Sequence, residues 1–155
     1  MSGGRDGYYD AIVVSTKVLN RKRLSQWDVK IHSMKNSAVM IGVVPADIDQ
    51  SVNWFDNRCG WFISVFQGYY FSGPPQNHYN SQTIHSGIKV SPGAIIRVQH
   101  DPLLRTITFI VGGVPVSPCI VGVQGTTLSP AVLLANRGDC VEFLSSHSRN
   151  KAPNE

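Results

Sequence analysis

The chain lacks the features that mark several large classes of protein. Its cysteines number three, form no Cys-x-x-Cys pair and have no histidines spaced to complete a zinc site. The sequence has no Asn-x-Ser/Thr acceptor, no apolar run of signal-peptide length near its start, and no apolar run long enough to span a membrane. These absences favour an intracellular protein, cytoplasmic or nuclear, with inert buried thiols at Cys59, Cys119 and Cys140.

Charged residues are scarce as well. They make up 15% of the 155 residues, against 42% for hydrophobic residues, and this balance is typical of a folded chain. A chain of this length can bury an adequate core as one domain without disulfides or metals. We expect one domain over residues 10–145, a flexible arm over residues 1–9 and a frayed polar tail over residues 146–155.

The basic residues are unevenly distributed. The net charge is +4, and seven of the fourteen lysines and arginines precede Asn36. Arg21, Lys22 and Arg23 are consecutive and form the one tight cluster. A cluster of three between two strands is more often solvated than a phosphate site. The charge therefore indicates solubility first, and nucleic-acid binding through this basic turn is an alternative.

Short segments with apolar residues at every second position dominate the rest of the chain. Between Gln26 and Ile31, the residues Trp27, Val29 and Ile31 share one face, which predicts a half-buried strand. Ala38 to Val44 is almost continuously apolar, and this predicts a strand covered on both faces.

The segment from Pro92 to Val121 predicts three strands in antiparallel succession. Ala94 to Gln99 and Thr106 to Val111 alternate in the same way and are separated by a turn. Gly112-Gly113 then suits a two-residue hairpin into a third strand, Val114 to Val121, because both glycines can adopt positive φ.

The remaining strands and the loops between them follow from turn residues. We expect further strands at Ala11 to Thr16, Cys59 to Phe66, Gly68 to Phe71, Leu128 to Leu134 and Cys140 to Leu144. Long loops are expected at Ala46 to Arg58 and Ser72 to Ser86. About ten short strands without a helical stripe predict an all-β fold, a two-sheet antiparallel β-sandwich.

No pattern indicates catalysis or a metal site. His100 precedes Asp101, but neighbours in a strand point to opposite faces, and Asp101-Pro102 is typical of a turn start. His78 and His85 share one loop without the further ligands that a metal needs. Phosphate-binding glycine loops and nucleophile motifs are absent. We expect no enzyme activity, no cofactor and no metal.

The strand motifs, taken in order, resemble a SPRY domain over about Asp10 to Leu144. The resemblance is carried by QWDVKI at Gln26 to Ile31, MIGVVP at Met40 to Pro45, an apolar strand ending in Asp101, TITF at Thr106 to Phe109 followed by a glycine turn, and LSPAV at Leu128 to Val132. Gly93-Ala94 replaces the Gly-Asp that often precedes the family's central strand, and Gly112-Gly113 replaces its usual Asn-Gly turn.

The resemblance implies a SPRY-like, concanavalin-like β-sandwich that acts as an adaptor or substrate-recognition module. Such domains generally grip a partner protein or linear peptide with loops at one end of the sandwich. Because the longest apolar runs are of strand length, we expect no membrane binding, and we expect a monomer. Matched along the motifs, the partner-binding positions fall at Tyr9, Asn36, Ser37, Trp54, Asn136, Arg137 and Gly138.

Trp54 is the most informative of these positions, because it lies in a loop among Asn, Asp and Ser. The residue is either a buried cap over a sheet edge or an anchor that faces the partner. A lectin-like sugar site is a further alternative for a loop of this composition, although no calcium-binding pattern accompanies it.

Overall fold

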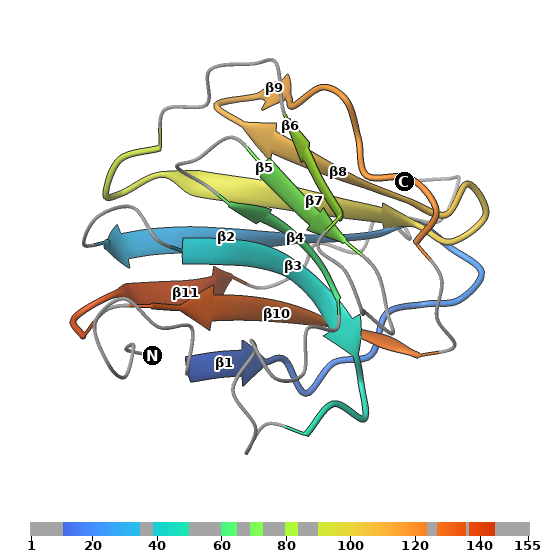
Figure 1. The fold of residues 1–155 in the computed structure, drawn as a ribbon, viewed down its shortest axis with the longest axis horizontal. Coiled ribbons are helices and arrows are strands. Elements are labelled where there is room, and N and C mark those ends of the chain that lie inside the picture. Colours follow the sequence, from blue (N-terminus) through green and yellow to red (C-terminus); the bar gives the residue numbers. More distant parts are fainter. Residues whose placement is uncertain are drawn as a thin grey trace, which may run out of the picture.

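The computed structural model describes residues 11–34, 39–49, 60–64, 69–72, 80–83, 90–123, 127–135 and 137–144, which form strands and turns (Figure 1). The strands are β1 (Ala11–Val14), β2 (Ser25–Ser33), β3 (Val39–Pro45), β4 (Trp61–Ser64), β5 (Tyr69–Ser72), β6 (Asn80–Thr83), β7 (Ile95–Asp101), β8 (Thr106–Val111), β9 (Val114–Pro115), β10 (Leu128–Leu134) and β11 (Cys140–Leu144). Among these residues, no helix is long and apolar enough to cross a membrane.

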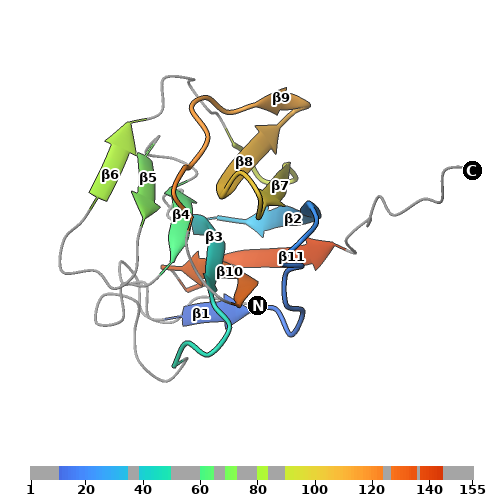
Figure 2. The ribbon, with the colours of Figure 1, turned by 90° about the vertical axis from the view of Figure 1, so that its right-hand side faces the viewer.

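The strands form two antiparallel sheets that pack face to face. One sheet has the order β1-β10-β3-β4-β5-β6, and the other has the order β11-β2-β7-β8-β9. Figure 2 shows the six-stranded sheet on the left and the five-stranded sheet on the right. The expected all-β, two-sheet antiparallel sandwich is therefore confirmed.

The alternating strands bury the faces that their sequences predict. Trp27, Val29 and Ile31 of β2 are buried, and so are Ile96 and Val98 of β7. These side chains fill the space between the sheets together with alternate residues of β3, β4, β8 and β10. Burial of one face fixes the register, because a slip by one residue would expose the whole apolar set.

β3 is covered on both faces, as its continuous apolar sequence predicts. Val39, Ile41 and Val43 belong to the core between the sheets. Met40 and Val44 point to the opposite face, where they form a second buried cluster with residues of β4 and β10. β3 lies inside its sheet, between β10 and β4.

The glycine in the Ile-Gly-Val motif of β3 is explained by the approach of the next strand. Gly42 lies opposite Phe62 on β4, and a Cβ on Gly42 would lie 1.8 Å from the carbonyl oxygen of Trp61. No side chain fits at this position unless the two strands separate.

Two expectations about strand extent are wrong. The third strand of the central block spans only Val114–Pro115, with an isolated bridge between Ile107 and Ile120 farther along. Pro115 and Pro118 lack the N–H groups that a continuous ladder requires. The preceding turn is as predicted, because Gly112 and Gly113 adopt φ of 59° and 78° between β8 and β9.

The loop expected over Ser72 to Ser86 contains a strand. β6 pairs with β5 at the edge of the six-stranded sheet. Its sequence, Asn-Ser-Gln-Thr, has no apolar alternation. β6 is therefore defined by its backbone pairing with β5, which leaves no periodic signal in the sequence.

The cysteines were expected to be buried, and two of them are only half-buried. Cys119 and Cys140 are free thiols of intermediate exposure. Cys140 begins β11, where its neighbour Val141 takes the buried position. Cys59 lies outside the described residues.

Candidate functional site

The strands run between two ends of the sandwich, and the expected partner site is at one of them. We call this the turn end and define it by Ala11, Ser33, Leu134 and Gly138. Ala11 pairs with Leu134, and the Ser33 hydroxyl donates a hydrogen bond to the carbonyl oxygen of Gly138 at 2.6 Å. The end of β2, the start of β1 and the turn between β10 and β11 are therefore adjacent.

Two of the seven predicted partner-binding residues lie within the described residues. Arg137 and Gly138 are exposed in the turn between β10 and β11, and Gly138 adopts a φ of 94°. The other five lie outside the described residues: Tyr9, Asn36, Ser37, Trp54 and Asn136.

The described neighbours of four of these five residues lie at the turn end. Tyr9 is two residues before Ala11, Asn36 and Ser37 are separated from Ser33 only by Met34 and residue 35, and Asn136 directly precedes Arg137. The described residues that flank these four positions therefore lie at the same end of the sandwich.

The loop that carries Trp54 leaves and re-enters the sheet at the opposite end. It follows β3, whose last residue, Pro45, pairs with Leu128, and it returns to β4, where Trp61 pairs with Val43. The Ala46 amide also donates to the Thr127 carbonyl at 2.9 Å. A seven-residue strand spans about 20 Å, and this distance separates the loop's attachment points from the turn end.

The outer face of the five-stranded sheet is polar and cross-linked. Arg97 on β7 donates two hydrogen bonds to the carboxylate of Asp28 on β2, at 2.9 and 3.1 Å. Hydrogen bonding to Asp28, together with its charge, raises the pKa of Arg97. Gln99 donates to Gln26 at 2.8 Å in the neighbouring cross-strand pair. These side chains are engaged with each other across the two strands.

His100 and Asp101 do not form a dyad. His100 is buried, and its Nδ1 has no hydrogen-bond partner within the described part of the chain. Burial lowers the pKa of its imidazole against the opposing effect of the Asp101 charge. Asp101 Oδ1 accepts hydrogen bonds from the amides of Leu103 and Leu104 at 2.9 and 3.0 Å. Asp101 thus starts a turn, as its sequence predicts. Among the described residues, no group of three or more His, Cys, Asp or Glu side chains could hold a metal ion.

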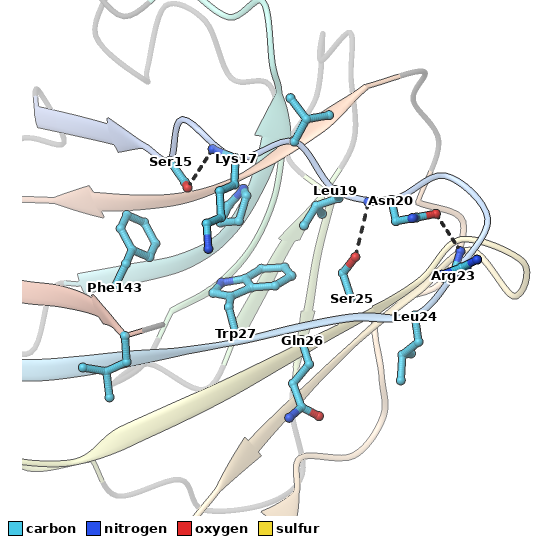
Figure 3. A pocket seen from close by; sticks show the side chains of 13 residues that line it. Ser15, Lys17, Leu19, Asn20, Arg23, Leu24, Ser25, Gln26, Trp27 and Phe143 are labelled. Carbon is cyan, nitrogen blue, oxygen red and sulfur yellow. Dashed lines mark hydrogen bonds between the residues drawn. The ribbon is translucent and has the colours of Figure 1, made fainter. Parts of the chain in front are cut away.

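A pocket that the sequence patterns did not predict lies at the other end of β2. It has a volume of about 310 Å³ and is lined by residues of the β1–β2 connection, the first residues of β2, Pro130 and the end of β11. Figure 3 shows the Trp27 indole between Phe143 and Ser25. We call the end that contains Ser25, Leu128 and Leu144 the pocket end. The connection between β1 and β2 has no periodicity that could have predicted this pocket. The basic turn from Arg21 to Arg23 is the sequence feature that lies beside it.

Comparison with solved structures identifies the fold that the sequence motifs predicted. No family model matches the chain. No curated protein matches it either. The SPRY domain of human HERC1 is similar in structure, with a TM-score of 0.71, 18% identity, and coverage of 92% of this chain and 85% of that domain. The PSpry domain of TRIM65 is also similar, with a TM-score of 0.61, 13% identity, and coverage of 86% and 70%. The chain therefore has the fold of a SPRY domain.

Proposed function

We propose that this protein is a non-catalytic interaction module that binds a peptide segment or surface of a partner protein at the turn end. SPRY domains generally act as protein-interaction modules, and the SPRY fold of this chain supports that role. The proposed contact residues at the turn end are Tyr9, Asn36, Ser37, Asn136, Arg137 and Gly138. Trp54 is proposed to join them from a loop that is attached to the sheet at the opposite end.

The observation that carries the proposal is the bond between Ser33 and Gly138. It joins the end of β2 to the β10–β11 turn, next to Arg137. This turn also connects the two sheets, because β10 and β11 belong to different sheets. A rigid scaffold that presents loops at one end reduces the ordering cost of binding. Arginine is also a favoured interface residue, because its planar guanidinium can form paired hydrogen bonds with an acceptor.

The proposal is tested by a pull-down, followed by isothermal titration with the partner that it identifies. The immobilised protein should retain a partner from a lysate, and isothermal titration with the purified partner should give a dissociation constant. Arg137→Ala should weaken that binding, whereas Lys22→Ala should leave it unchanged, because Lys22 is exposed in the connection before β2, at the other end of the sandwich. Equal binding by wild type and the Arg137 variant would place the partner elsewhere on the molecule.

A further inference from the structure

The pocket end gathers most of the exposed apolar side chains that the structure describes. Seven large hydrophobic side chains are exposed among the described residues, and five belong to segments at this end: Val18, Leu24, Leu103, Leu104 and Val121. Single exposed leucines are ordinary on a protein surface, but a group of them beside a pocket is typical of an interaction site.

Strand pairing holds these segments together. Ser25 pairs with His100, so Leu24 is next to the turn that carries Leu103 and Leu104. Those two leucines are 79% and 72% exposed. Figure 1 shows this turn, after β7, close to the connection that leads into β2 at one end of the sandwich. The Val123 amide donates to the Arg105 carbonyl, which brings the segment after Val121 to the same turn.

The pocket itself is apolar inside and basic at its edge. Leu19, Trp27 and Phe143 contribute apolar surface, while Lys17 and Arg23 supply positive charge. No acidic residue is among the described residues that line the pocket. Arg21 and Lys22 directly precede Arg23, so the local charge is strongly positive.

The basic turn has a defined backbone conformation. The Asn20 side-chain oxygen accepts hydrogen bonds from the amides of Lys22 and Arg23 at 2.8 and 3.0 Å. The Ser25 hydroxyl oxygen accepts a hydrogen bond from the Asn20 amide at 3.3 Å, and this bond joins the turn to the start of β2. The cations are therefore presented beside the pocket by a hydrogen-bonded turn.

We propose that the pocket end is a second binding site, which takes a linear peptide with a large apolar side chain flanked by acidic residues. The apolar side chain enters the pocket over Trp27, a neighbouring apolar residue packs on Leu24 and Leu103, and an acidic residue pairs with Arg23. The pocket volume of about 310 Å³ is at the lower end of the range for ligand sites, about 300–1,000 Å³. This site does not depend on the proposed function of the turn end.

A peptide suits this surface better than a nucleic acid. Sites for single-stranded nucleic acids typically combine positive charge with exposed aromatic rings on which bases stack. The aromatic residues that line the pocket are Trp27, which is 5% exposed, and Phe143, which is partly buried against the core. The exposed leucines of the neighbouring turn offer apolar contacts and no stacking surface.

The Trp27 indole adds a polar feature to the pocket floor. Its Nε1–H is buried and has no acceptor among the residues that the structure describes. An apolar side chain that enters the pocket would contact the indole ring. Binding should therefore alter Trp27 fluorescence, because the indole lines the pocket.

A phage-displayed random peptide library, panned against the full chain, tests the proposal. Selected peptides should carry Asp or Glu within a few positions of a large apolar residue, and their binding should weaken with added salt. The double variant Arg23→Glu/Leu24→Ser should bind a selected peptide about tenfold more weakly or worse. The matched control Arg137→Glu/Ile95→Ser makes the same kinds of substitution at exposed positions outside the pocket end and should retain binding.

The outcomes separate this site from the turn end. Loss of peptide binding in the Arg137 control alone would assign the peptides to the turn end and overturn the second site. The second site is also wrong if panning selects no peptide, if the selected peptides lack acidic residues, or if only a single-stranded oligonucleotide shows binding that depends on Arg23. Thermal unfolding verifies that each variant is folded, and the milder Arg23→Gln replaces the double variant if that protein unfolds.

Discussion

Asp28 and Arg97 lie directly opposite each other on β2 and β7, and the guanidinium binds both carboxylate oxygens. The pair is partly shielded, because the Asp28 side chain is 14% exposed and that of Arg97 is 37% exposed. It crosses the centre of the five-stranded sheet, where β2 and β7 are neighbours between β11 and β8. Bidentate geometry distinguishes the pair from an ordinary surface ion pair.

A double-mutant cycle with Asp28→Ala and Arg97→Ala should give a coupling free energy of about 1 kcal/mol. Solvent screening at the exposed guanidinium keeps the value near that of surface pairs, and the two parallel hydrogen bonds place it at the upper end of that range. Urea unfolding measures each variant. The coupling should fall with added salt, whereas a Gln26/Gln99 cycle on the same strands should not respond to salt. A coupling near zero would mean that each residue acts alone.

Gly42→Ala should destabilise the protein by about 3 kcal/mol or more, since the new Cβ would meet the Trp61 carbonyl oxygen in a well-packed core. Unfolding by urea measures the change. The control is Gly112→Asn, where no heavy atom lies within 4 Å of the added Cβ and asparagine tolerates positive φ. A Gly42→Ala protein as stable as wild type would mean that β3 and β4 can separate without cost.

Trp27→Ala should cost about 3–5 kcal/mol of unfolding free energy, the usual loss for emptying a buried aromatic site. Trp27→Phe should cost much less, since it keeps a ring in the core and removes an indole N–H that has no acceptor. Both are measured by denaturant unfolding. If the two variants were equally destabilised, the indole N–H would have a role that the structure does not show.

The sequence predicts the strands whose apolar residues follow a pattern, either alternating, as in β2, or continuous, as in β3. β2, β7 and β8 each bury alternate residues, so period-two alternation identifies them and their faces. β6 was missed because backbone pairing, and no apolar pattern, defines it. β9 is shorter than predicted because apolar residues continue past prolines that cannot extend the ladder.

The candidate site is less predictable, because it depends on which turns meet in space. The Ser33–Gly138 bond joins residues that are 105 positions apart. The pocket forms where the β1–β2 connection meets β2 and the end of β11. Neither arrangement leaves a periodic signal in the sequence. Motif order predicted the partner-binding positions through the resemblance, and these remain a prediction, while the pocket end became visible only in the structure.

The buried imidazole of His100 should make the free energy of unfolding depend on pH. Burial lowers the pKa of its imidazole below the ordinary value of 6.5, so the unfolded chain binds more protons as pH falls below that value. Unfolding free energy should therefore decrease from pH 7 toward about pH 5. His100→Leu should remove this contribution, and its stability relative to wild type should rise as pH falls. The control is His32→Gln, because His32 is exposed on the outer face beside Glu142. Parallel pH profiles for wild type and His100→Leu would contradict the prediction.

The proposed partner site makes a paired prediction about Trp54 and Arg137. If Trp54 is an anchor, Trp54→Ala should weaken binding of the verified partner by about 2 kcal/mol or more, the threshold for an interface hot spot. Arg137→Ala should weaken the same partner, because the two residues are expected to share one surface. The loop that carries Trp54 is attached to β3 and β4 at the pocket end, so it must extend toward Arg137 for both effects to occur together.

Isothermal titration measures both effects, and urea unfolding of each variant separates binding from stability. Trp54→Ala should change unfolding free energy far less than Trp27→Ala, since an anchor in a loop contributes little to the core. If Trp54→Ala loses binding only because it unfolds, Trp54 is a buried cap and the site lies elsewhere. If Trp54→Ala weakens peptides selected at the pocket end, while Arg137→Ala does not, then Trp54 belongs to the second site. Loss of the same partner from both variants, with both still folded, would place Trp54 and Arg137 in one interface.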